Sequence, residues 1–521
     1  DIDMIERYCY INEQERALLT CSAAPIVLLD RRDHIDLPNS IAPGKNQLGF
    51  MLPYSPLHHL VMKEFDQPLV LTSGNISDIP QCIDNDDAQL KLASIADYFL
   101  LHDRDIVNRL DDSVMRIMAG EPQCLRRARG YAPESLVLPD AFANSPAILA
   151  MGGELKNSFC LIKDGLAIVS QHMGDLENYD TYIDYQHNID LYQHLFQHKP
   201  KHIAVDAHPD YIATKLGNEL ANHAKLGLHS IQHHHAHIAS CLADNGYAYT
   251  EVSVLGIVLD GLGYGDDNTL WGGEFLLANY SESRRLAHFK PVPLIGGTLA
   301  MKQPWRNTYA HLSACVGWQR CENEFGQLSL VKQLASKPLA TFEGMLSSQL
   351  NCPTASSAGR LFDAVAAAIG LCFEKVEYEG QAAIELEACI DKTAWLDSKN
   401  PAYEFKVEGG VIDPTPMWLS LLNDLRCSIA KSFISARFHR GLSLAIQQLA
   451  IQLVNQHNIK TVALSGGVFQ NKTLFEHVKK GLMKQEVDVL CHRNIPTNDG
   501  GLSLGQAVIT AARVMRKSQC V

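Results

Sequence analysis

The fold is decided by the stretch Val254-Leu-Gly-Ile-Val-Leu-Asp-Gly-Leu-Gly-Tyr-Gly265, an apolar run that ends in alternating glycines. Together with Leu270-Trp-Gly-Gly-Glu-Phe-Leu-Leu277, it predicts two strands joined by a glycine-rich turn. The same pattern occurs earlier in the chain, in Ile148-Leu-Ala-Met-Gly-Gly-Glu-Leu-Lys-Asn-Ser-Phe-Cys-Leu161. Two copies of one strand–glycine–strand unit predict an internal duplication.

Prolines divide the chain near residue 140. Pro133, Pro139 and Pro146 disfavour helix in the residues before them and predict an extended linker. In residues 1–140, the apolar runs 24–29, 68–72 and 97–101 alternate with the helical stretch 87–95, which predicts an α/β domain with a central sheet. Residues 141–521 form the second domain, whose long helical stretches are 360–373 and 417–454.

The composition limits the class of protein. A length of 521 residues favours more than one domain, and 46% hydrophobic with 20% charged residues is typical of folded proteins. The net charge of -13 disfavours an extended nucleic-acid groove. No apolar run is long enough to span a membrane. The 14 cysteines include no C-x-x-C pair, which favours a reducing, cytoplasmic compartment.

The most specific local motif is Gln232-His-His-His-Ala-His237. If a helix begins near His233, then His233 and His237 lie one turn apart on one face, where both imidazoles can reach one cation. Histidines at a helix start can also cap it or face solvent, but four within five positions favour a metal or phosphate site. Asp499, before the last helix, and Asp260, at a strand end, are the candidate carboxylate ligands, although Asp499 can equally be an N-cap. Such a ligand set suits iron or zinc.

Glycine-rich loops predict a site for phosphate groups. One loop follows a strand and opens a helix, and free amides at a helix start favour anions. Three such elements resemble the split nucleotide cleft of the actin-like ATPase superfold. Their candidate residues are Ser465, Gly466, Gly467 and Asn471, then Gly261 and Gly263, then Gly359 and Asp363.

The first domain carries a cluster of arginines. Six arginines lie within 26 residues and are interrupted by Asp111-Asp112-Ser113. Such a cluster suits phosphate or carboxylate, although surface solubility would also explain it. Ser73 and Asn75 lie in a turn after an apolar run. The arginines are Arg104, Arg109, Arg116, Arg126, Arg127 and Arg129.

Over nearly its whole length the chain resembles the hydrogenase maturation carbamoyltransferase family HypF. The resemblance is carried by Leu71-Thr-Ser-Gly-Asn75, His102-Asp-Arg-Asp-Ile-Val107, Arg109-Leu-Asp-Asp-Ser-Val114, Leu125-Arg-Arg-Ala-Arg-Gly-Tyr131, Gln232-His-His-His-Ala-His237, Leu270-Trp-Gly-Gly-Glu274, Lys302-Gln-Pro-Trp-Arg-Asn307, Ser356-Ser-Ala-Gly-Arg-Leu-Phe-Asp-Ala-Val365 and Asn498-Asp-Gly-Gly-Leu-Ser-Leu-Gly-Gln506. It implies a YrdC-like domain followed by a TsaD-like domain of the actin-like superfold.

The resemblance also implies an ATP-dependent reaction. Carbamoyl phosphate supplies carbamate. The YrdC-like domain, with Mg²⁺ as cofactor, joins this carbamate to ATP to form carbamoyl adenylate and release pyrophosphate. The TsaD-like domain transfers the carbamoyl group to the C-terminal cysteine of the partner HypE, for the cyanide ligand of [NiFe] hydrogenase. The implied adenylate-forming residues are Ser73, Asn75, Ser113, Arg104 and Arg127. The implied metal ligands, for one Fe or Zn ion, are His233, His237 and Asp499, with Asp260 as a further candidate.

The sequence departs from the family pattern at its start. The family's acylphosphatase and zinc-finger regions are absent, and the chain begins inside the YrdC-like domain. We therefore expect a truncated domain with weak pyrophosphate release. Because the adenylate is unstable, we also expect an internal chamber between the two sites.

Two alternatives stay open. The first is tRNA threonylcarbamoylation, which uses the same two folds but is disfavoured by the acidic composition and the unbroken histidine triplet. The second is a metal- and nucleotide-binding scaffold without turnover. The sequence also leaves open whether the metal is iron or zinc and whether the chain forms a homodimer.

Overall fold

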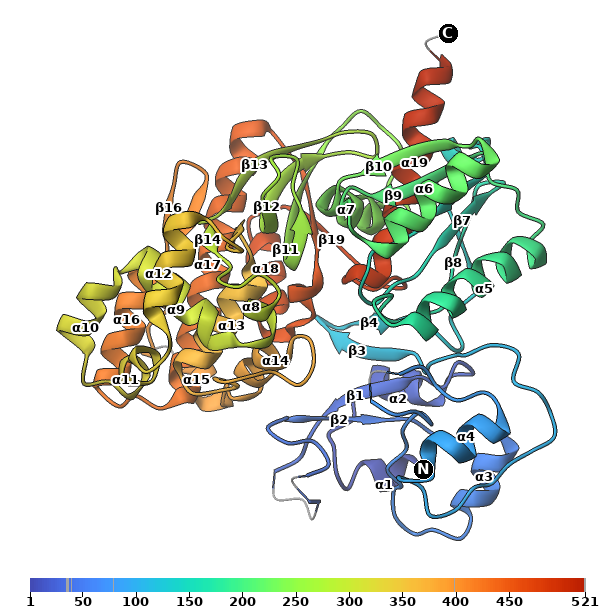
Figure 1. The fold of residues 1–521 in the computed structure, drawn as a ribbon, viewed down its shortest axis with the longest axis horizontal. Coiled ribbons are helices and arrows are strands. Elements are labelled where there is room, and N and C mark those ends of the chain that lie inside the picture. Colours follow the sequence, from blue (N-terminus) through green and yellow to red (C-terminus); the bar gives the residue numbers. More distant parts are fainter. Residues whose placement is uncertain (34–36, 39, 78, 398, 520–521) are drawn as a thin grey trace.

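The computed structural model describes residues 1–33, 37–38, 40–77, 79–397 and 399–519, which contain a small sheet and two larger ones (Figure 1). The small sheet lies at one end of the molecule, below the other two in Figure 1. None of the helices in these ranges is both long and apolar enough to cross a membrane.

The small sheet belongs to the first domain. Its order is β2 (Gln47–Phe50), β1 (Ile26–Asp30), β3 (Val114–Met118) and β4 (Glu121–Arg126), with β1 and β3 parallel. Helices α1 (Ile2–Ile5) and α2 (Glu13–Thr20) precede it, and α2 packs against β1 and β3. The sheet places β3 and β4 next to the second domain, which is where the site described below is found.

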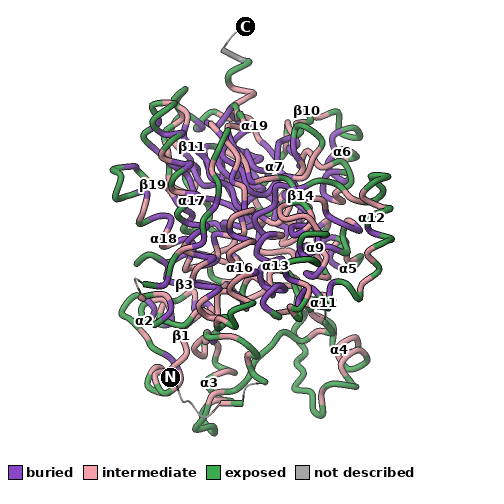
Figure 2. Tube along the Cα trace, turned by 90° about the vertical axis from the view of Figure 1, so that its left-hand side faces the viewer, coloured by how far each residue is buried: buried purple, intermediate pink, exposed green. Residues whose placement is uncertain are grey.

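Two strands predicted in the first domain are absent. Between β2 and β3, the described residues form only the helices α3 (Pro56–Met62) and α4 (Asn85–Leu92). The apolar runs 68–72 and 97–101 form no strand, and Val70 and Leu100 are 79% and 76% exposed. Runs that are apolar on both faces need neighbours on both faces to become strands, and no described strand pairs with these two. Figure 2 shows this region as a mainly exposed part of the molecule.

The second domain contains the predicted duplication. One sheet has the order β10-β9-β6-β7-β8-β5, and the other contains the order β19-β18-β11-β12-β13. In each, three antiparallel strands are followed by two strands parallel to the first. The two halves thus share one topology. The strands of the first half are β6 (Ile148–Ala150), β7 (Cys160–Lys163), β8 (Leu166–Val169), β9 (His202–Asp206) and β10 (Gly227–Ile231). Those of the second are β11 (Val254–Tyr264), β12 (Leu270–Ala278), β13 (Ser283–Phe289), β18 (Thr461–Ser465) and β19 (Asp488–Cys491).

Two helices that pack against each other form the buried centre of this domain. Helix α7 (His233–Asp244) packs against α19 (Leu502–Gln519) and against β11 and β18. The first half also carries α5 (Tyr179–Leu195) and α6 (Ile212–Ala224). The remaining elements are α8 (Leu299–Lys302), α9 (Pro304–Cys315), α10 (Trp318–Phe325), α11 (Ser329–Ala335), α12 (Leu339–Ser348), α13 (Ala358–Ala368), α14 (Gln381–Ala388), α15 (Lys392–Leu396), α16 (Thr415–Arg426), α17 (Lys431–His457), α18 (Lys472–Met483), the short strands β14 (Val292–Pro293), β15 (Thr354–Ala355), β16 (Lys406–Glu408) and β17 (Val411–Asp413), and the short 3-10 turns η1 (Asp140–Phe142), η2 (Gly467–Gln470) and η3 (Asp499–Gly501).

Two further expectations differ from the structure. The helical stretch 417–454 is two helices, α16 and α17, because Ser428 between them has a φ of 56°, a left-handed conformation in which a helix cannot continue. The segment expected as a linker is packed: β5 (Ser135–Val137) pairs with β8, and Phe142 is fully buried against Tyr280. The boundary near residue 140 stays a prediction.

Candidate metal and nucleotide site

Helix α7 places two histidines on one face, as the sequence predicts. The helix begins directly after β10, and the side chain of Gln232 caps it by accepting a hydrogen bond from the His235 amide at 2.7 Å. The rings of His233 and His237 lie 5.1 Å apart, and both residues are fully buried. The helix start therefore fixes the direction in which both imidazoles point.

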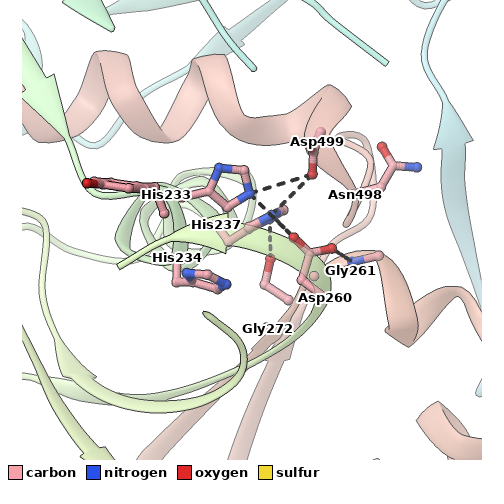
Figure 3. A network of polar contacts seen from close by, with 12 residues as sticks. His233, His234, His237, Asp260, Gly261, Gly272, Asn498 and Asp499 are labelled. Atoms are coloured by element: carbon pink, nitrogen blue, oxygen red, sulfur yellow. Dashed lines mark hydrogen bonds and ion pairs between the residues drawn. The ribbon is translucent and has the colours of Figure 1, made fainter. Parts of the chain in front are cut away.

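Two carboxylates meet these imidazoles. Asp260 Oδ2 lies 3.4 Å from His233 Nε2 and 3.5 Å from His237 Nε2, and Asp499 Oδ1 lies 3.8 Å and 3.5 Å from the same two atoms. The ligand atoms of all four residues fall within 4.8 Å of one another. Figure 3 shows the two rings and two carboxylates converging on one point. We name these four residues the His–Asp cluster.

Local backbone geometry aims each carboxylate. The pairing of β11 with β12 shifts register between Leu259 and Gly263, and this irregularity lets Asp260 leave the regular side-chain alternation. Its other oxygen, Oδ1, accepts a hydrogen bond from the Gly467 amide at 3.1 Å. The expected cap role of Asp499 belongs instead to Asn498, whose side chain accepts from the Gly500 amide. Asp499 is thereby left free to face the histidines.

Burial and charge compete at the cluster. Burial by itself lowers the pKa of His233, but Asp206, Asp260 and Asp499 outweigh it and hold that pKa well above its usual value. Burial is likewise outweighed at His237, whose pKa is raised by Asp260 and Asp499. Asp260 is buried too, yet the two imidazoles hold its pKa well below the usual range. The carboxylate is therefore charged at neutral pH.

The donor set fits a metal ion. His237 Nε2 is buried, faces the two carboxylates and has no hydrogen-bond partner of normal geometry, a buried polar atom that a bound cation would satisfy. Two imidazoles and two carboxylates are ligands that iron and zinc both accept.

The remaining histidines of the motif have other environments. His234 lies away from the converging groups in Figure 3, and His235 Nε2 contacts the Asn279 carbonyl at 2.7 Å.

The glycine elements meet beside Asp260. Gly261 lies in strand β11 and Gly359 in the first turn of helix α13, not in the loops that the sequence predicts. A Cβ atom on Gly359 would lie 3.1 Å from Gly261 Cα, so the strand and the helix touch, and Ser357 Oγ donates to the Gly261 carbonyl. Gly466 has a φ of 98°, and a Cβ there would lie 2.3 Å from the Leu259 carbonyl oxygen. Nothing lies within 4 Å of the Cβ position of Gly261, so the strand has open space in front of it at this point. Gly261, Gly359 and Gly467 therefore line a common edge next to the cluster.

Other predicted nucleotide residues have structural contacts. A Cβ on Gly263 would lie 2.5 Å from the rings of His233 and His234, so this glycine lets the strand approach helix α7. Asp363 forms an ion pair with Arg360 at 3.1 Å, and burial raises its pKa. Asn471 caps α18 through the Leu474 amide and contacts His439 at 2.9 Å. Ser465 Oγ contacts His492 and His237.

The predicted adenylate residues of the first domain do not contact one another as a group. Ser73 and Asn75 are hydrogen-bonded to each other. Ser113 is buried and bonds the Arg129 carbonyl and the Ala128 amide. The Arg127 guanidinium donates to the carbonyls of Val169, Tyr131 and Glu134. Arg104 is exposed and makes no polar contact with the described residues. Their shared role in an adenylate site stays a prediction.

A cavity of about 520 Å³ lies between strands β3 and β4 of the first domain and the turn that carries Asp499, and none of the four cluster side chains lines it. Asn498 and Gly500, on either side of Asp499, form one wall. The opposite wall comes from β3 and β4, and Ser73 does not line it. Its lining side chains include the cations Arg126, Arg127 and Lys156 together with His172, Ser158, Ser170, Tyr378 and Gln470.

Sequence reasoning missed two residues at this site. Asp206 Oδ2 lies 2.9 Å from His233 Nδ1, and the available signal was its place at the end of an apolar strand, the same context that identified Asp260. Lys156 lines the cavity and pairs with Glu379. Because Lys156 is part of the Gly-Gly-Glu-Leu-Lys-Asn turn, its position between two strands was the signal.

Comparisons with known proteins agree with this architecture. Three family models match: "Telomere recombination" over residues 1–128, "HypF Kae1-like domain" over 143–244, and "Carbamoyltransferase, Kae1-like Domain, second subdomain" over 256–506. Carbamoyltransferase HypF of Rhodobacter capsulatus is 42% identical over 512 residues, which cover 98% of this chain and 66% of that protein. A carbamoyltransferase HypF homolog of Cupriavidus necator is 35% identical, with 72% of this chain and 93% of that protein covered.

Solved structures match as well. A full-length HypF crystallised in a phosphate- and nucleotide-bound form has a TM-score of 0.89 at 38% identity, covering 98% of this chain and 78% of that one. HypF of T. kodakarensis has a TM-score of 0.90 at 32% identity, covering 99% and 67%. The chain spans 66% and 64% of the lengths of two curated relatives, from Rhodobacter capsulatus and Synechocystis. The predicted fold, a YrdC-like domain followed by duplicated TsaD-like halves, is confirmed.

Proposed function

This chain belongs to the HypF carbamoyltransferase family, and we propose that it transfers a carbamoyl group at the His–Asp cluster. One observation carries the proposal: four buried or half-buried ligand groups converge within 4.8 Å of one another beside a glycine-lined edge and a cavity of about 520 Å³. Its relatives are named carbamoyltransferases, which are transferase enzymes.

The cluster would hold one Fe or Zn ion through His233, His237, Asp260 and Asp499. Such an ion supplies Lewis acidity that polarises a carbonyl group. The protein's own residues supply the rest. Asp260 links the cluster to the phosphate-binding edge, because its second oxygen accepts the Gly467 amide at 3.1 Å. A nucleotide phosphate at that edge would therefore lie next to the reacting carbonyl.

The proposed substrates are carbamoyl phosphate and MgATP. Water cleaves the P–O bond of carbamoyl phosphate and gives phosphate and carbamate. A carbamate oxygen then attacks the α-phosphorus of ATP, so that pyrophosphate leaves and carbamoyl adenylate forms. Carbamate is a poor electrophile, and the adenylate provides AMP as a better leaving group. We assign this activation to the first domain, with Ser73, Asn75, Arg104, Ser113 and Arg127 as its candidate residues.

Transfer requires a thiol from another protein. No cysteine of the described residues belongs to the His–Asp cluster. A partner thiolate would attack the carbamoyl carbon and AMP would leave, which produces a protein thiocarbamate. We propose the C-terminal cysteine of HypE as this thiol. The cavity, whose lining includes Arg126 and Lys156, would carry the anionic adenylate towards the cluster. A reducing compartment such as the cytoplasm would keep the thiol available.

The test combines metal analysis with group transfer. We expect one Fe or Zn per wild-type chain, and loss of that metal from His237→Ala with retained circular dichroism. Supplied with HypE, MgATP and radiolabelled carbamoyl phosphate, the wild-type chain should label the HypE C-terminal cysteine and release AMP and pyrophosphate, at the weak rate expected from its sequence. Labelling of tRNA in the presence of free threonine instead would favour threonylcarbamoylation. HypE binding without any transfer would leave a scaffold as the function.

A further inference from the structure

The two imidazoles of the His–Asp cluster are held from behind by different groups. His233 Nδ1 lies 2.9 Å from Asp206 Oδ2, and both side chains are fully buried. His237 Nδ1 lies 3.4 Å from Ser465 Oγ, which in turn lies 2.8 Å from His492 Nε2. Each ring thus turns Nδ1 away from the cluster and Nε2 towards it.

We propose that Asp206 and Ser465 are positioning residues that set the tautomer and orientation of the two histidines for metal binding. A carboxylate only accepts hydrogen bonds, so Nδ1 of His233 must carry a hydrogen, and Nε2 is the nitrogen that binds the metal once it has released its own proton. The Ser465 hydroxyl does the same for His237 when it accepts from Nδ1 and donates to His492. Burial lowers the pKa of His492 to about 3, so its ring is neutral and can accept.

The duplicated fold supports this assignment. Asp206 ends β9 and Ser465 ends β18, and these strands occupy equivalent positions in the two sheets. Each half of the domain therefore contributes one outer partner from the same kind of strand end, while helix α7 carries both histidines between them. The halves differ in chemistry, since one supplies a charge and the other a hydroxyl.

This difference predicts unequal effects. An anionic acceptor makes an imidazole a stronger metal ligand than a neutral one does, and loss of such partners typically costs about 10- to 100-fold in affinity. Asp206→Asn should therefore weaken metal binding by about 10- to 100-fold, and Ser465→Ala by a smaller factor. Both effects should appear without any change to the four ligands themselves.

The inference rests on the metal site proposed above, and its test separates the two. The full chain, stripped of metal, is titrated with Zn²⁺ alone against a chelating dye and with Co²⁺ alone by its visible spectrum. Matched controls are Asp210→Asn, an exposed carboxylate on the next loop, and Ser347→Ala, an exposed serine. Folding is checked by circular dichroism. Wild-type affinity in Asp206→Asn, with loss of binding in His237→Ala, would overturn this inference and leave the metal site standing. Absence of binding by the wild type would overturn both.

A second measurement needs no substitution of Asp206 or Ser465. Nitrogen-15 spectra of the metal-free wild-type chain report which ring nitrogen carries hydrogen, and the His233 and His237 signals are assigned by their loss in alanine variants. Because the neighbouring aspartates raise the pKa of both rings, the spectra are recorded at a pH high enough to give the neutral rings, in which we expect the hydrogen on Nδ1. Hydrogen on Nε2 of His233 in the neutral ring would contradict the role of Asp206, even if Asp206→Asn failed to fold.

Discussion

Gly261 and Gly263 lie two residues apart in β11, yet a methyl group at each position would meet different surroundings. At Gly263 it would collide with two histidine rings at 2.5 Å, whereas at Gly261 nothing lies within 4 Å. Gly263 is thus needed for packing against helix α7, whereas Gly261 leaves space at the proposed phosphate edge. The sequence shows only an alternation of glycines, in which the two have the same appearance.

We predict opposite phenotypes for alanine at these positions. Gly263→Ala should lower the free energy of unfolding by about 1–3 kcal/mol, because the histidines must move, and should weaken Zn²⁺ binding. Gly261→Ala should change stability by less than about 0.5 kcal/mol but weaken nucleotide binding. Urea unfolding and calorimetry with ATP measure both. Equal stability of the two variants would contradict the distinction.

Buried histidines outside the cluster predict acid sensitivity. Burial, together with Lys290, lowers the pKa of His311 to about 3. The unfolded chain takes up a proton below about pH 6.5 while the folded chain does not, so His311 destabilises the fold as pH falls from 6.5 towards 3, by roughly 1.4 kcal/mol per pH unit. Between pH 7 and 5, His311→Gln should lose roughly 2 kcal/mol less stability than the wild type.

Urea unfolding at a series of pH values measures this difference. The control is His223→Gln, which replaces an exposed histidine. Identical pH dependence of His311→Gln and the wild type would show that His311 becomes protonated in the folded chain.

At the scale of elements, one short turn connects the two domains at the cluster. Asn498, beside Asp499, donates from Nδ2 to the Leu125 carbonyl in β4 and to Gln470 Oε1 in η2, both at 3.1 Å. Its Oδ1 caps η3 through the Gly500 amide. Arg116 in β3 reaches the Gln470 carbonyl at 3.1 Å. Asn498 therefore fixes the turn that carries Asp499 and also ties this turn to the first domain.

Two substitutions separate these roles. Asn498→Ser keeps a capping oxygen but is too short to reach Leu125, so we expect Zn²⁺ affinity near the wild-type value and faster hydrogen exchange of the β4 amides. Asn498→Ala removes both contacts and should also weaken Zn²⁺ binding and cost about 1 kcal/mol. Unchanged exchange in β4 in both variants would show that Asn498 does not hold the domains together.

At the scale of the whole molecule, stability is unevenly distributed. The core of the second domain is closely packed, while the region between β2 and β3 carries many exposed apolar side chains and little regular structure (Figure 2). Regions with few buried contacts open most readily. The duplicated sheets should therefore persist when this region opens or is cut.

Limited trypsin digestion should show this difference. We expect the first cleavages at exposed sites such as Lys63 and Arg104, and a resistant fragment that contains β3, β4 and the whole second domain. This fragment should keep its bound Zn²⁺. Early cleavage within residues 147–512, identified by mass spectrometry, would contradict the expected difference in local stability.

The sequence by itself determined what depends on local periodicity and local conformation. It predicted the repeated strand–glycine–strand unit, the pairing of His233 with His237 on one helix face, and the glycine turn at Gly466, because each follows from residues close together in the chain. It also suggested both carboxylates, Asp260 and Asp499, from their predicted places at a strand end and a helix start, but it could not exclude a simple cap for Asp499.

Only the tertiary structure decided which of these residues meet. Asp206 and Ser465 end β9 and β18, whereas Asp260 lies within β11 at its register shift and not at the strand end that the sequence predicts. The three residues converge on helix α7 only because the two duplicated sheets enclose it. Runs 68–72 and 97–101 show the converse: their apolar pattern favours strands, yet a strand forms only where a neighbour supplies its hydrogen bonds. Periodicity sets the direction of a side chain, whereas long-range packing decides what stands opposite it.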